Sequence, residues 1–381
     1  MMRLDAFLIL ISILRVVTLV DSSLVISSDC QPKCGNISIP YPFGINNEGC
    51  YLNEYYKIEC LENSTGGGEY PVLSKFNMTI VNISLPEDYY GSQTSALFGS
   101  VRVRIPVTSM GCSINGKETE SPLNLTGSPY FVEYDNYLVA LGCKGKASLT
   151  NIEPNKVVCD LDCTSKTEVH SNNNIPFLDN TGCSNNTLPL SGNQICTEKQ
   201  TGCDGNGCCL KNMLSGRQQV IGVKIEKSEE NSTAKEECIV AFLSDESYTK
   251  SNGTNPMPLF VMGYSTVKLG WVIQTNNLSF LNSLSCKQRN KYTNTFDIAR
   301  KISCVCDNST IFENSYASCG CSRGYTGNAY VFNGCEDIDE CSHKSKNYCR
   351  VSDTCVNLPG TYDCVGDKTK AIMAGNHRVF S

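Results

Sequence analysis

Cysteine content constrains the fold of this chain more than any other feature, because 24 of its 381 residues are cysteine. An even and unusually high number of cysteines indicates disulfides that form in an oxidising compartment. Structural zinc is the alternative, but the chain has only three histidines and no repeated CxxC motif. We therefore expect a disulfide-bonded protein outside the cytosol. Cys208 and Cys209 are adjacent and cannot easily bond each other, so each should bond a different cysteine.

The N-terminal sequence and the glycosylation motifs agree with export. Residues 1–22 have the pattern of a secretory signal peptide, with Arg3 ahead of an apolar stretch and small residues before an expected cleavage after Ser22. A membrane anchor is the alternative, but the apolar stretch is shorter than the roughly 20 residues that a span requires. Ten Asn-x-Ser/Thr sequons predict a glycoprotein: Asn36, Asn63, Asn77, Asn82, Asn124, Asn185, Asn231, Asn252, Asn277 and Asn308.

Charge and hydropathy argue against several other classes. The formal net charge is -6 and there is no long basic tract, so nucleic acid is not an expected partner. No segment after residue 22 approaches the length of a membrane span, and we expect the exported chain to be soluble. The three histidines have no neighbouring nucleophile motif, which argues against triad catalysis. Paired carboxylates for glycoside hydrolysis remain an alternative, because their separation is spatial.

Residue alternation predicts a mainly β, multi-domain fold. In residues 100–109, SVRVRIPVTS, valine and isoleucine alternate with arginine, as in a strand with one buried face. No convincing amphipathic helix is present, and the weak candidate is 232–242. Similar strand patterns occur at 77–85, 130–141, 219–226 and 265–275. We expect β-rich domains at 30–145 and 155–285, small cysteine-rich modules at 286–335 and 337–366, and a polar tail at 367–381.

The first cysteine-rich module has a recognisable order of residues. Cys319-Gly-Cys321, then Gly-Tyr-Thr-Gly at 324–327 and a closing Cys335, resemble the second half of an epidermal-growth-factor-like (EGF-like) module. The resemblance implies that the first cysteine bonds the third, the second the fourth and the fifth the sixth. With Cys286, Cys304 and Cys306 as the first three, the implied disulfides are Cys286–Cys306, Cys304–Cys319 and Cys321–Cys335.

The second module combines cysteines with oxygen ligands. The run DIDEC at 337–341, followed by CVN at 355–357 and YDC at 362–364, resembles a calcium-binding EGF-like module. Asp337, Glu340 and Asn357 offer carboxylate and amide oxygens, and Ca²⁺ takes six to eight oxygen ligands. The resemblance implies that backbone carbonyls complete the set and that two disulfides hold it. The implied carbonyls belong to Ile338, Leu358 and Thr361, and the implied disulfides are Cys341–Cys355 and Cys349–Cys364.

This module departs from the family pattern at its end. Gly366 stands where the fifth cysteine belongs, and no cysteine follows it. We therefore expect an incomplete module with a looser site, and an affinity for calcium of about 10⁻⁴ to 10⁻³ M, as in extracellular modules. An acidic turn between modules is the alternative explanation of the run.

The N-terminal part carries a further resemblance. Cys30-QPK-Cys34-GNISIPYPFGI, then Gly-Cys50-Tyr and YKIE-Cys60, resemble the galacturonan-binding ectodomain of plant wall-associated receptor kinases. GCDGNGCC at 202–209 and LGWVIQT around Trp271 are similar to other elements of the same family. With the two EGF-like modules, the resemblance extends over nearly the whole exported chain and fits the wall-associated-kinase-like branch best.

The resemblance implies binding of pectin, specifically of de-esterified homogalacturonan. Such a polyanion requires cationic side chains or bridging Ca²⁺ at its carboxylates, and aromatic faces for its rings. Lysines and arginines that only solubilise exposed strands are the alternative explanation. The candidate residues are Arg102, Arg104, Lys144, Lys146, Lys287, Arg289 and Lys291.

The leading hypothesis is an extracellular ectodomain that binds wall polysaccharide and takes part in cell-wall sensing. The alternative is a secreted decoy or co-receptor that binds a protein, such as a full-length receptor, rather than pectin. Members of this family continue into a membrane span and a kinase, but this sequence has no glycine-rich nucleotide loop and no HRD or DFG segment. We therefore expect no enzymatic activity, and KTKAIMAG at 368–375 would begin a juxtamembrane segment that a premature or alternatively spliced ending cuts short.

Overall fold

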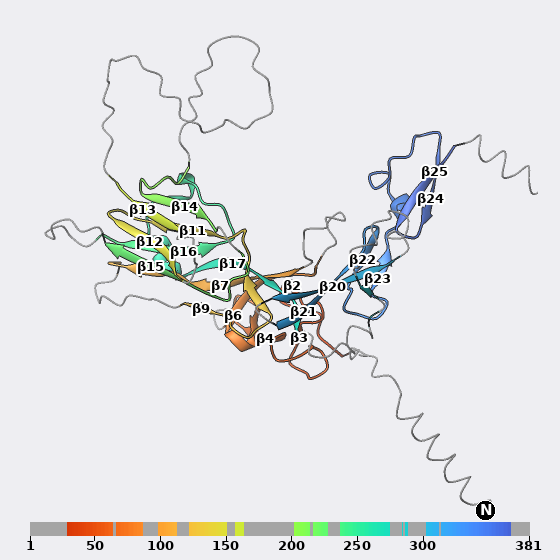
Figure 1. Ribbon diagram of the computed structural model, residues 1–381, viewed down its shortest axis with the longest axis horizontal. Coiled ribbons are helices and arrows are strands. Elements are labelled where there is room, and N and C mark those ends of the chain that lie inside the picture. The colour runs from red at the N-terminus through yellow and green to blue at the C-terminus, as the bar shows by residue number, and fades with distance from the viewer. Residues whose placement is uncertain are drawn as a thin grey trace, which may run out of the picture. The chain divides into compact units, whose positions relative to one another are not determined.

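The structure is a computed structural model, and strands dominate it, as the sequence predicts (Figure 1). It divides into two compact units, each described by itself: unit 1 is Met1–Arg104, Leu125–Glu133 and Lys268–Ser381, and unit 2 is Ile105–Asn124 and Tyr134–Val267. The expected signal peptide and tail lie outside the described residues. These are 29–63, 66–86, 98–112, 122–150, 157–163, 202–213, 216–227, 237–274, 284, 286–288, 302–311 and 314–366.

The first part of unit 1 is built on one sheet. It contains β1 (Lys33–Cys34), β2 (Ile37–Ser38), β3 (Gly44–Ile45), β4 (Lys57–Glu62), β5 (Glu69–Leu73), the 3₁₀ helix η1 (Ser74–Phe76), β6 (Met78–Ser84), β7 (Gly99–Pro106), β10 (Tyr130–Val132) and β17 (Tyr264–Trp271). β1 and β2 form a hairpin, and the other strands form a seven-stranded sheet in the order β10-β17-β7-β6-β5-β4-β3. β3 pairs with β4 in parallel, and β4 to β7 pair as successive antiparallel neighbours.

Strand β7 shows why the sequence pattern predicts this sheet. Val101, Val103 and Ile105 are buried, Arg102 is half-buried and Arg104 is exposed. Successive side chains of a strand point to opposite faces, so the alternation places the apolar side chains in the core. The predicted strand at 100–109 is therefore confirmed.

An aromatic cluster forms the core of unit 1. Trp271 is fully buried, with its ring centroid 5.3 Å from that of Phe43 and 5.4 Å from that of Tyr330. Tyr56 packs edge-on against the same indole and donates its hydroxyl to the carbonyl of Val272. Such ring pairs contribute about 0.5–1.5 kcal/mol each beyond burial. The cluster therefore joins the N-terminal strands to the first cysteine-rich module in one core.

Unit 2 contains two four-stranded sheets. Its elements are β8 (Thr108–Met110), β9 (Leu123–Asn124), β11 (Tyr137–Leu141), β12 (Gly145–Thr150), β13 (Val158–Leu161), β14 (Cys208–Asn212), β15 (Val220–Lys227), β16 (Ile239–Ser244), the 3₁₀ helix η2 (Lys250–Asn252) and the helix α2 (Met257–Met262). The strand orders are β14-β11-β16-β8 and β13-β12-β15-β9. The paired strands β11 and β16 contribute to one apolar cluster that includes Val139, Leu141, Val240 and Phe242. The described end of the weak helix candidate at 232–242 is strand β16, and the short α2 was not predicted.

The C-terminal part of unit 1 is a series of short hairpins. It contains β18 (Ile273–Gln274), β19 (Lys287–Gln288), β20 (Cys304–Ile311), β21 (Asn314–Cys321), β22 (Tyr325–Gly327), β23 (Cys335–Asp337), the 3₁₀ helix η3 (Glu340–Ser342), β24 (Thr354–Leu358) and β25 (Thr361–Val365). β18 to β21 form a four-stranded sheet, whereas β22–β23 and β24–β25 are two-stranded. Small cores of this kind depend on disulfides.

Eleven disulfides use 22 of the 24 cysteines, and the other two, Cys183 and Cys196, lie outside the described residues. Cys208 bonds Cys203 and Cys209 bonds Cys159, so the adjacent cysteines have different partners, as predicted. The expected disulfides Cys321–Cys335, Cys341–Cys355 and Cys349–Cys364 are present.

Two expected disulfides are wrong. The structure has Cys286–Cys304 and Cys306–Cys319 in place of Cys286–Cys306 and Cys304–Cys319. Strand register is the reason: Cys306 lies directly opposite Cys319 on antiparallel β20 and β21, with the Cα atoms 4.0 Å apart. Cys304 lies opposite Cys321 instead, and the parallel pairing of β19 with β20 brings Cys286 beside Cys304.

The division into units also differs from the expected boundaries near 145 and 285. Residues 105–124 and 134–150 belong to unit 2, and residues 268–285 belong to unit 1. Long-range strand pairing is the reason, because Leu269–Trp271 of β17 pairs with Tyr130–Val132 of β10. Composition along the chain does not record such a pairing.

Candidate functional site

A pocket of about 480 Å³ lies in unit 1, between the N-terminal strands and the first cysteine-rich module. One wall comes from Ser38, the last residue of β2, from Pro40 after it, and from the end of β6. The other wall is the turn that joins β21 to β22, with Arg323 and Tyr325. The pocket therefore combines apolar surface with hydroxyl groups and a cation. Sequence analysis did not propose Arg323 or Tyr325 as binding residues, because it used this turn only as part of the EGF-like pattern.

One hydrogen bond joins the two sides of the pocket, and two more order the module behind it. Asn328 donates its Nδ2 to the carbonyl of Tyr41 at 2.7 Å and accepts from the amide of Tyr330 at 2.9 Å. The Tyr330 hydroxyl in turn accepts from the buried amide of Cys319 at 3.0 Å. Burial, and secondarily the Asp337 carboxylate, raises the pKa of Tyr325, so its phenol stays a neutral hydrogen-bond donor.

The structure brings Asp337 and Asn357 together, as the calcium hypothesis requires. Asp337 Oδ2 accepts from Asn357 Nδ2 at 2.7 Å, and its Oδ1 accepts from the amide of Gly360 at 2.5 Å. Leu358 and Thr361, whose carbonyls complete the expected set, lie opposite each other at the turn of the β24–β25 hairpin. Ile338, also expected as a carbonyl ligand, donates its amide to the carbonyl of Gly324 at 2.8 Å.

The neighbouring acidic residues have different roles. Asp339 caps the N-terminus of η3, accepting from the amides of Cys341 and Ser342 at 2.9 and 3.2 Å. Glu340 Oε2 is buried and has no hydrogen-bond partner among the described residues. A buried carboxylate oxygen without a hydrogen-bond partner costs free energy of folding. Coordination of a cation would offset that cost.

One group of cysteine and carboxylate side chains in the described chain has the spacing of metal ligands. Cys34, Cys60 and Glu69 lie close together. Cys34 and Cys60 bond each other, so neither offers a thiolate. This group is therefore structural.

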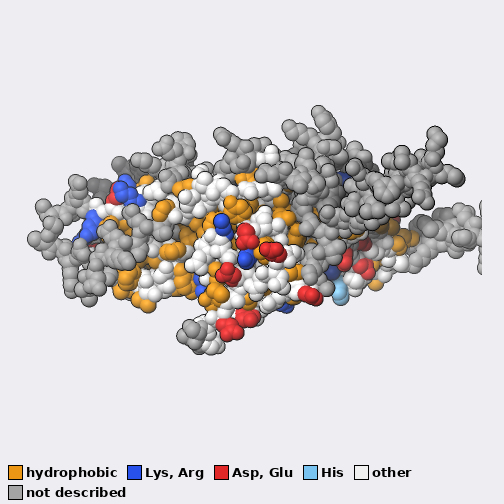
Figure 2. Space-filling view, turned by 90° about the horizontal axis from the view of Figure 1, so that it is seen from below, with side chains coloured by type: hydrophobic (Ala, Val, Ile, Leu, Met, Phe, Trp, Pro, Cys, Tyr) orange, Lys and Arg blue, Asp and Glu red, His pale blue; other side chains and the backbone are white. Residues whose placement is uncertain are grey.

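The described cationic candidates are divided between the two units. Lys144 and Lys146, in unit 2, pair with Glu237 at 3.3 Å and with Asp160 at 3.8 Å. Arg102, Arg104 and the exposed Lys287 belong to unit 1, and Arg289 and Lys291 lie outside the described residues. Figure 2 shows Lys and Arg side chains beside Asp and Glu side chains on the face it presents. Any attraction of a polyanion must therefore be local.

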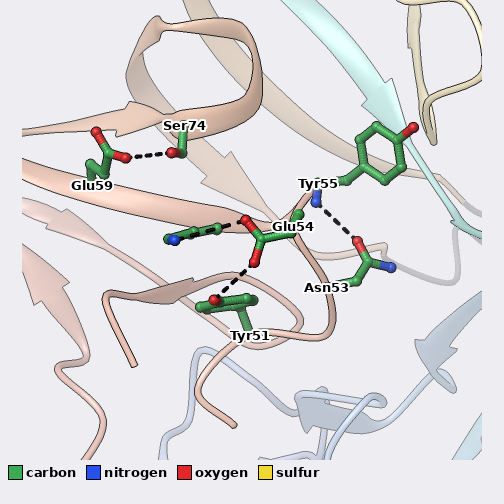
Figure 3. A network of polar contacts seen from close by, with 7 residues as sticks. Tyr51, Asn53, Glu54, Tyr55, Glu59 and Ser74 are labelled. Carbon is green, nitrogen blue, oxygen red and sulfur yellow. Dashed lines mark hydrogen bonds and ion pairs between the residues drawn. The ribbon is translucent and has the colours of Figure 1, made fainter. Parts of the chain in front are cut away.

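The N-terminal strands carry a polar network around Lys57. Glu54 accepts from the hydroxyl of Tyr51 at 3.1 Å and pairs with Lys57 at 3.8 Å, and Asn53 accepts from the amide of Tyr55 (Figure 3). The Glu54 carboxylate thus offsets the charge of Lys57. This network stabilises the turn before β4 rather than presenting an uncompensated cation.

Six sequon asparagines are described with their side chains, and all six are exposed: Asn36, Asn63, Asn77, Asn82, Asn124 and Asn252. The side chain of Asn308 and all of Asn185, Asn231 and Asn277 lie outside the description. Two of the exposed sequons include hydroxyl residues of the pocket, Ser38 and Ser84. Exposure is what attachment of a glycan requires, and glycosylation itself stays a prediction.

These features define a class: a disulfide-rich β protein of the ectodomain type. No helix in the described ranges is long and apolar enough to cross a membrane. Residues 30–90 match the family "Wall-associated receptor kinase galacturonan-binding", and residues 200–280 match the family "Wall-associated kinase". Neither match is to a kinase domain.

Three proteins of Arabidopsis thaliana are similar to this chain. The putative wall-associated receptor kinase-like 11 is 52% identical over 97% of this chain and 47% of its own length. The wall-associated receptor kinase-like proteins 17 and 18 are 46% and 49% identical, over 97% and 91% of this chain and 47% and 45% of their lengths. The chain thus spans about half the length of these curated relatives, and it is similar to them over nearly all of its own length. No solved structure shows significant similarity to it.

Proposed function

We propose that this chain is an extracellular ectodomain that binds de-esterified galacturonan, the acidic form of pectin, in cell-wall sensing. The observation that carries the proposal is the match of residues 30–90 to a galacturonan-binding family. Two disulfides, Cys30–Cys50 and Cys34–Cys60, fix that segment against the seven-stranded sheet. Extensive disulfide bonding supports a location outside the cytosol.

Binding of the full chain to defined oligosaccharides tests this function. The protein, secreted from plant cells with its glycans, is titrated by calorimetry with de-esterified oligogalacturonides at low salt. Fully methyl-esterified oligogalacturonides and a neutral oligosaccharide are the matched controls. We expect binding of the acidic ligand that weakens as salt rises, because the interaction is electrostatic. Equal binding of the acidic and neutral ligands would contradict a role for the carboxylates.

We also propose that the second cysteine-rich module, residues 337–366, binds calcium. The donors fit the ion, because two carboxylates and an amide belong to one small hairpin module and Glu340 has a buried oxygen without a partner. Asn357 donates its Nδ2 to Asp337, so its amide would have to turn over to offer Oδ1. A bound ion would supply positive charge between these carboxylates.

A calcium titration without polysaccharide tests the site, because a polyanion binds calcium itself. Asp337→Asn removes one carboxylate charge with little change in shape. Asp363→Asn is the matched control, since Asp363 is an exposed residue of β25 outside the expected ligand set. We expect the control to keep a dissociation constant of about 10⁻⁴ to 10⁻³ M and Asp337→Asn to lose it. Identical titrations for both variants would end the calcium proposal.

A second candidate function is binding of a protein partner, as a decoy or co-receptor. One observation favours it: Tyr348 and Val351 of the second module are 93% and 89% exposed. Exposed aromatic and aliphatic side chains are typical of binding surfaces when they cluster. Co-purification with ectodomains of related receptors, compared between the natural chain and Tyr348→Ser, distinguishes this function from pectin binding.

A further inference from the structure

We propose that the pocket between the end of β6 and the β21–β22 turn binds one galacturonate residue of the polysaccharide, with the sugar carboxylate on Arg323. This proposal rests on the proposed function, because it takes galacturonan as the ligand, and it locates where a single sugar acid is recognised. It also makes the first cysteine-rich module part of the binding site, beyond the residues 30–90 that match the galacturonan-binding family.

Charge is the first argument. Arg323 is the single charged residue among the described residues that line the pocket, and it is exposed. A guanidinium presents parallel N–H donors that match the two oxygens of a carboxylate. Among the described residues that line the pocket none is a carboxylate, so Arg323 is the lining group that suits an acidic sugar.

The remaining lining groups suit a sugar ring better than a bare anion. Ser38, Ser84 and Thr326 supply hydroxyl groups, each of which both donates and accepts hydrogen bonds, as sugar hydroxyls do. Tyr325 and Ile83 supply apolar surface for the C–H face of the ring. The volume of about 480 Å³ falls within the range of ligand pockets, about 300–1,000 Å³.

Local structure holds Arg323 in position before any ligand arrives. The amide of Ser322 donates to the carbonyl of Ser303, and the amide of Tyr325 donates to the carbonyl of Ser322, both at 2.9 Å. The disulfide Cys321–Cys335 ties the preceding residue to β23. A backbone fixed on both sides of the arginine reduces the entropy that binding would otherwise lose.

The test compares two arginine variants of the full glycosylated chain. Arg323→Gln removes the proposed carboxylate contact. Arg350→Gln is the matched control, because Arg350 is an exposed arginine of unit 1 that does not line the pocket. Each protein is titrated with trigalacturonate. We expect Arg323→Gln to lower the affinity at least about tenfold, which is ~1.4 kcal/mol, and Arg350→Gln to bind like the natural chain.

Methyl esters of the same trisaccharide show whether Arg323 contacts the carboxylate itself. Esterification should weaken binding to the natural chain about as much as Arg323→Gln does. The two changes remove the same contact, so together they should cost little more than either alone. Losses that simply add would show that Arg323 acts elsewhere.

A third variant guards against a folding artefact. Thr326→Val removes a pocket hydroxyl from an exposed position and leaves every sequon intact, unlike changes at Ser38 or Ser84. It should weaken the acid and the ester alike, with an unchanged unfolding midpoint. If the natural chain binds trigalacturonate but Arg323→Gln matches Arg350→Gln, the pocket assignment is overturned and the proposed function stands. If the natural chain binds no oligogalacturonide, both are overturned.

Discussion

Gly99→Ala should destabilise unit 1 although it adds only one methyl group. A Cβ built at Gly99 would overlap the five-membered and six-membered parts of the Trp271 indole. The indole cannot retreat easily, because Phe43 and Tyr330 contact it at ring distances of 5.3 and 5.4 Å. Overpacking of a close-packed core costs about 1–3 kcal/mol, which exceeds the several tenths that alanine gains over glycine in the unfolded chain.

Trp271 is the chain's single tryptophan, so its fluorescence reports unfolding of this core without interference. With disulfides intact and a urea dependence of about 1–3 kcal/mol per molar, a loss of about 2 kcal/mol lowers the midpoint by about 1 M. Gly366→Ala is the control, because a Cβ there meets only Asp353 Oδ1 at 3.6 Å. An unchanged midpoint and emission maximum in Gly99→Ala would refute the packing argument.

Three further predictions follow from single contacts. Tyr330→Phe should cost about 1–3 kcal/mol in urea unfolding, because the buried amide of Cys319 loses its acceptor; full stability would contradict that hydrogen bond's role. Burial raises the pKa of Tyr330 to about 12, so the folded state holds its proton above pH 10, where the unfolded state releases it. Stability should therefore fall between pH 10 and 12, and the phenolate absorbance of Tyr330 should appear together with unfolding. Titration of this phenol at pH 10 in the folded chain would contradict the prediction. Asn82→Gln removes the predicted glycan beside the pocket, because the side chain of Asn82 lies 3.2 Å from that of the pocket residue Ser84. This variant should bind long galacturonan more tightly, whereas Asn124→Gln should not. Equal effects of the two variants in a binding titration would show that the Asn82 glycan does not obstruct the pocket.

Local patterns made much of this structure predictable. Alternation at 100–109 predicted β7 because burial of one face leaves a period of two in the sequence. The close pairing of Asp337 with Asn357 followed from a resemblance whose spacing fixes a hairpin. Such features depend on residues that are near in sequence or held by a known motif.

Long-range pairing made the rest unpredictable. Cys306 and Cys319 bond because two strands happen to align them, and the spacing of cysteines alone allows several connections. The pocket is a similar case, since Ser84 and Arg323 are far apart in sequence and meet through the shared core around Trp271. No feature of the sequence around Arg323 predicts that this arginine and Ser84 line the same pocket.

The second cysteine-rich module, residues 337–366, directly contacts the residues around the pocket. Tyr325 pairs with Asp337 across β22 and β23, and Ile338 both donates its amide to Gly324 and lines the pocket. A Cβ at Gly324 would overlap the backbone of Gly360, so the two cysteine-rich modules touch through their main chains. A cation at Asp337 would therefore make one pocket wall more rigid and would reduce the negative charge next to the pocket. Both effects favour binding of an acidic sugar. These contacts are present although Gly366 stands where the fifth cysteine belongs.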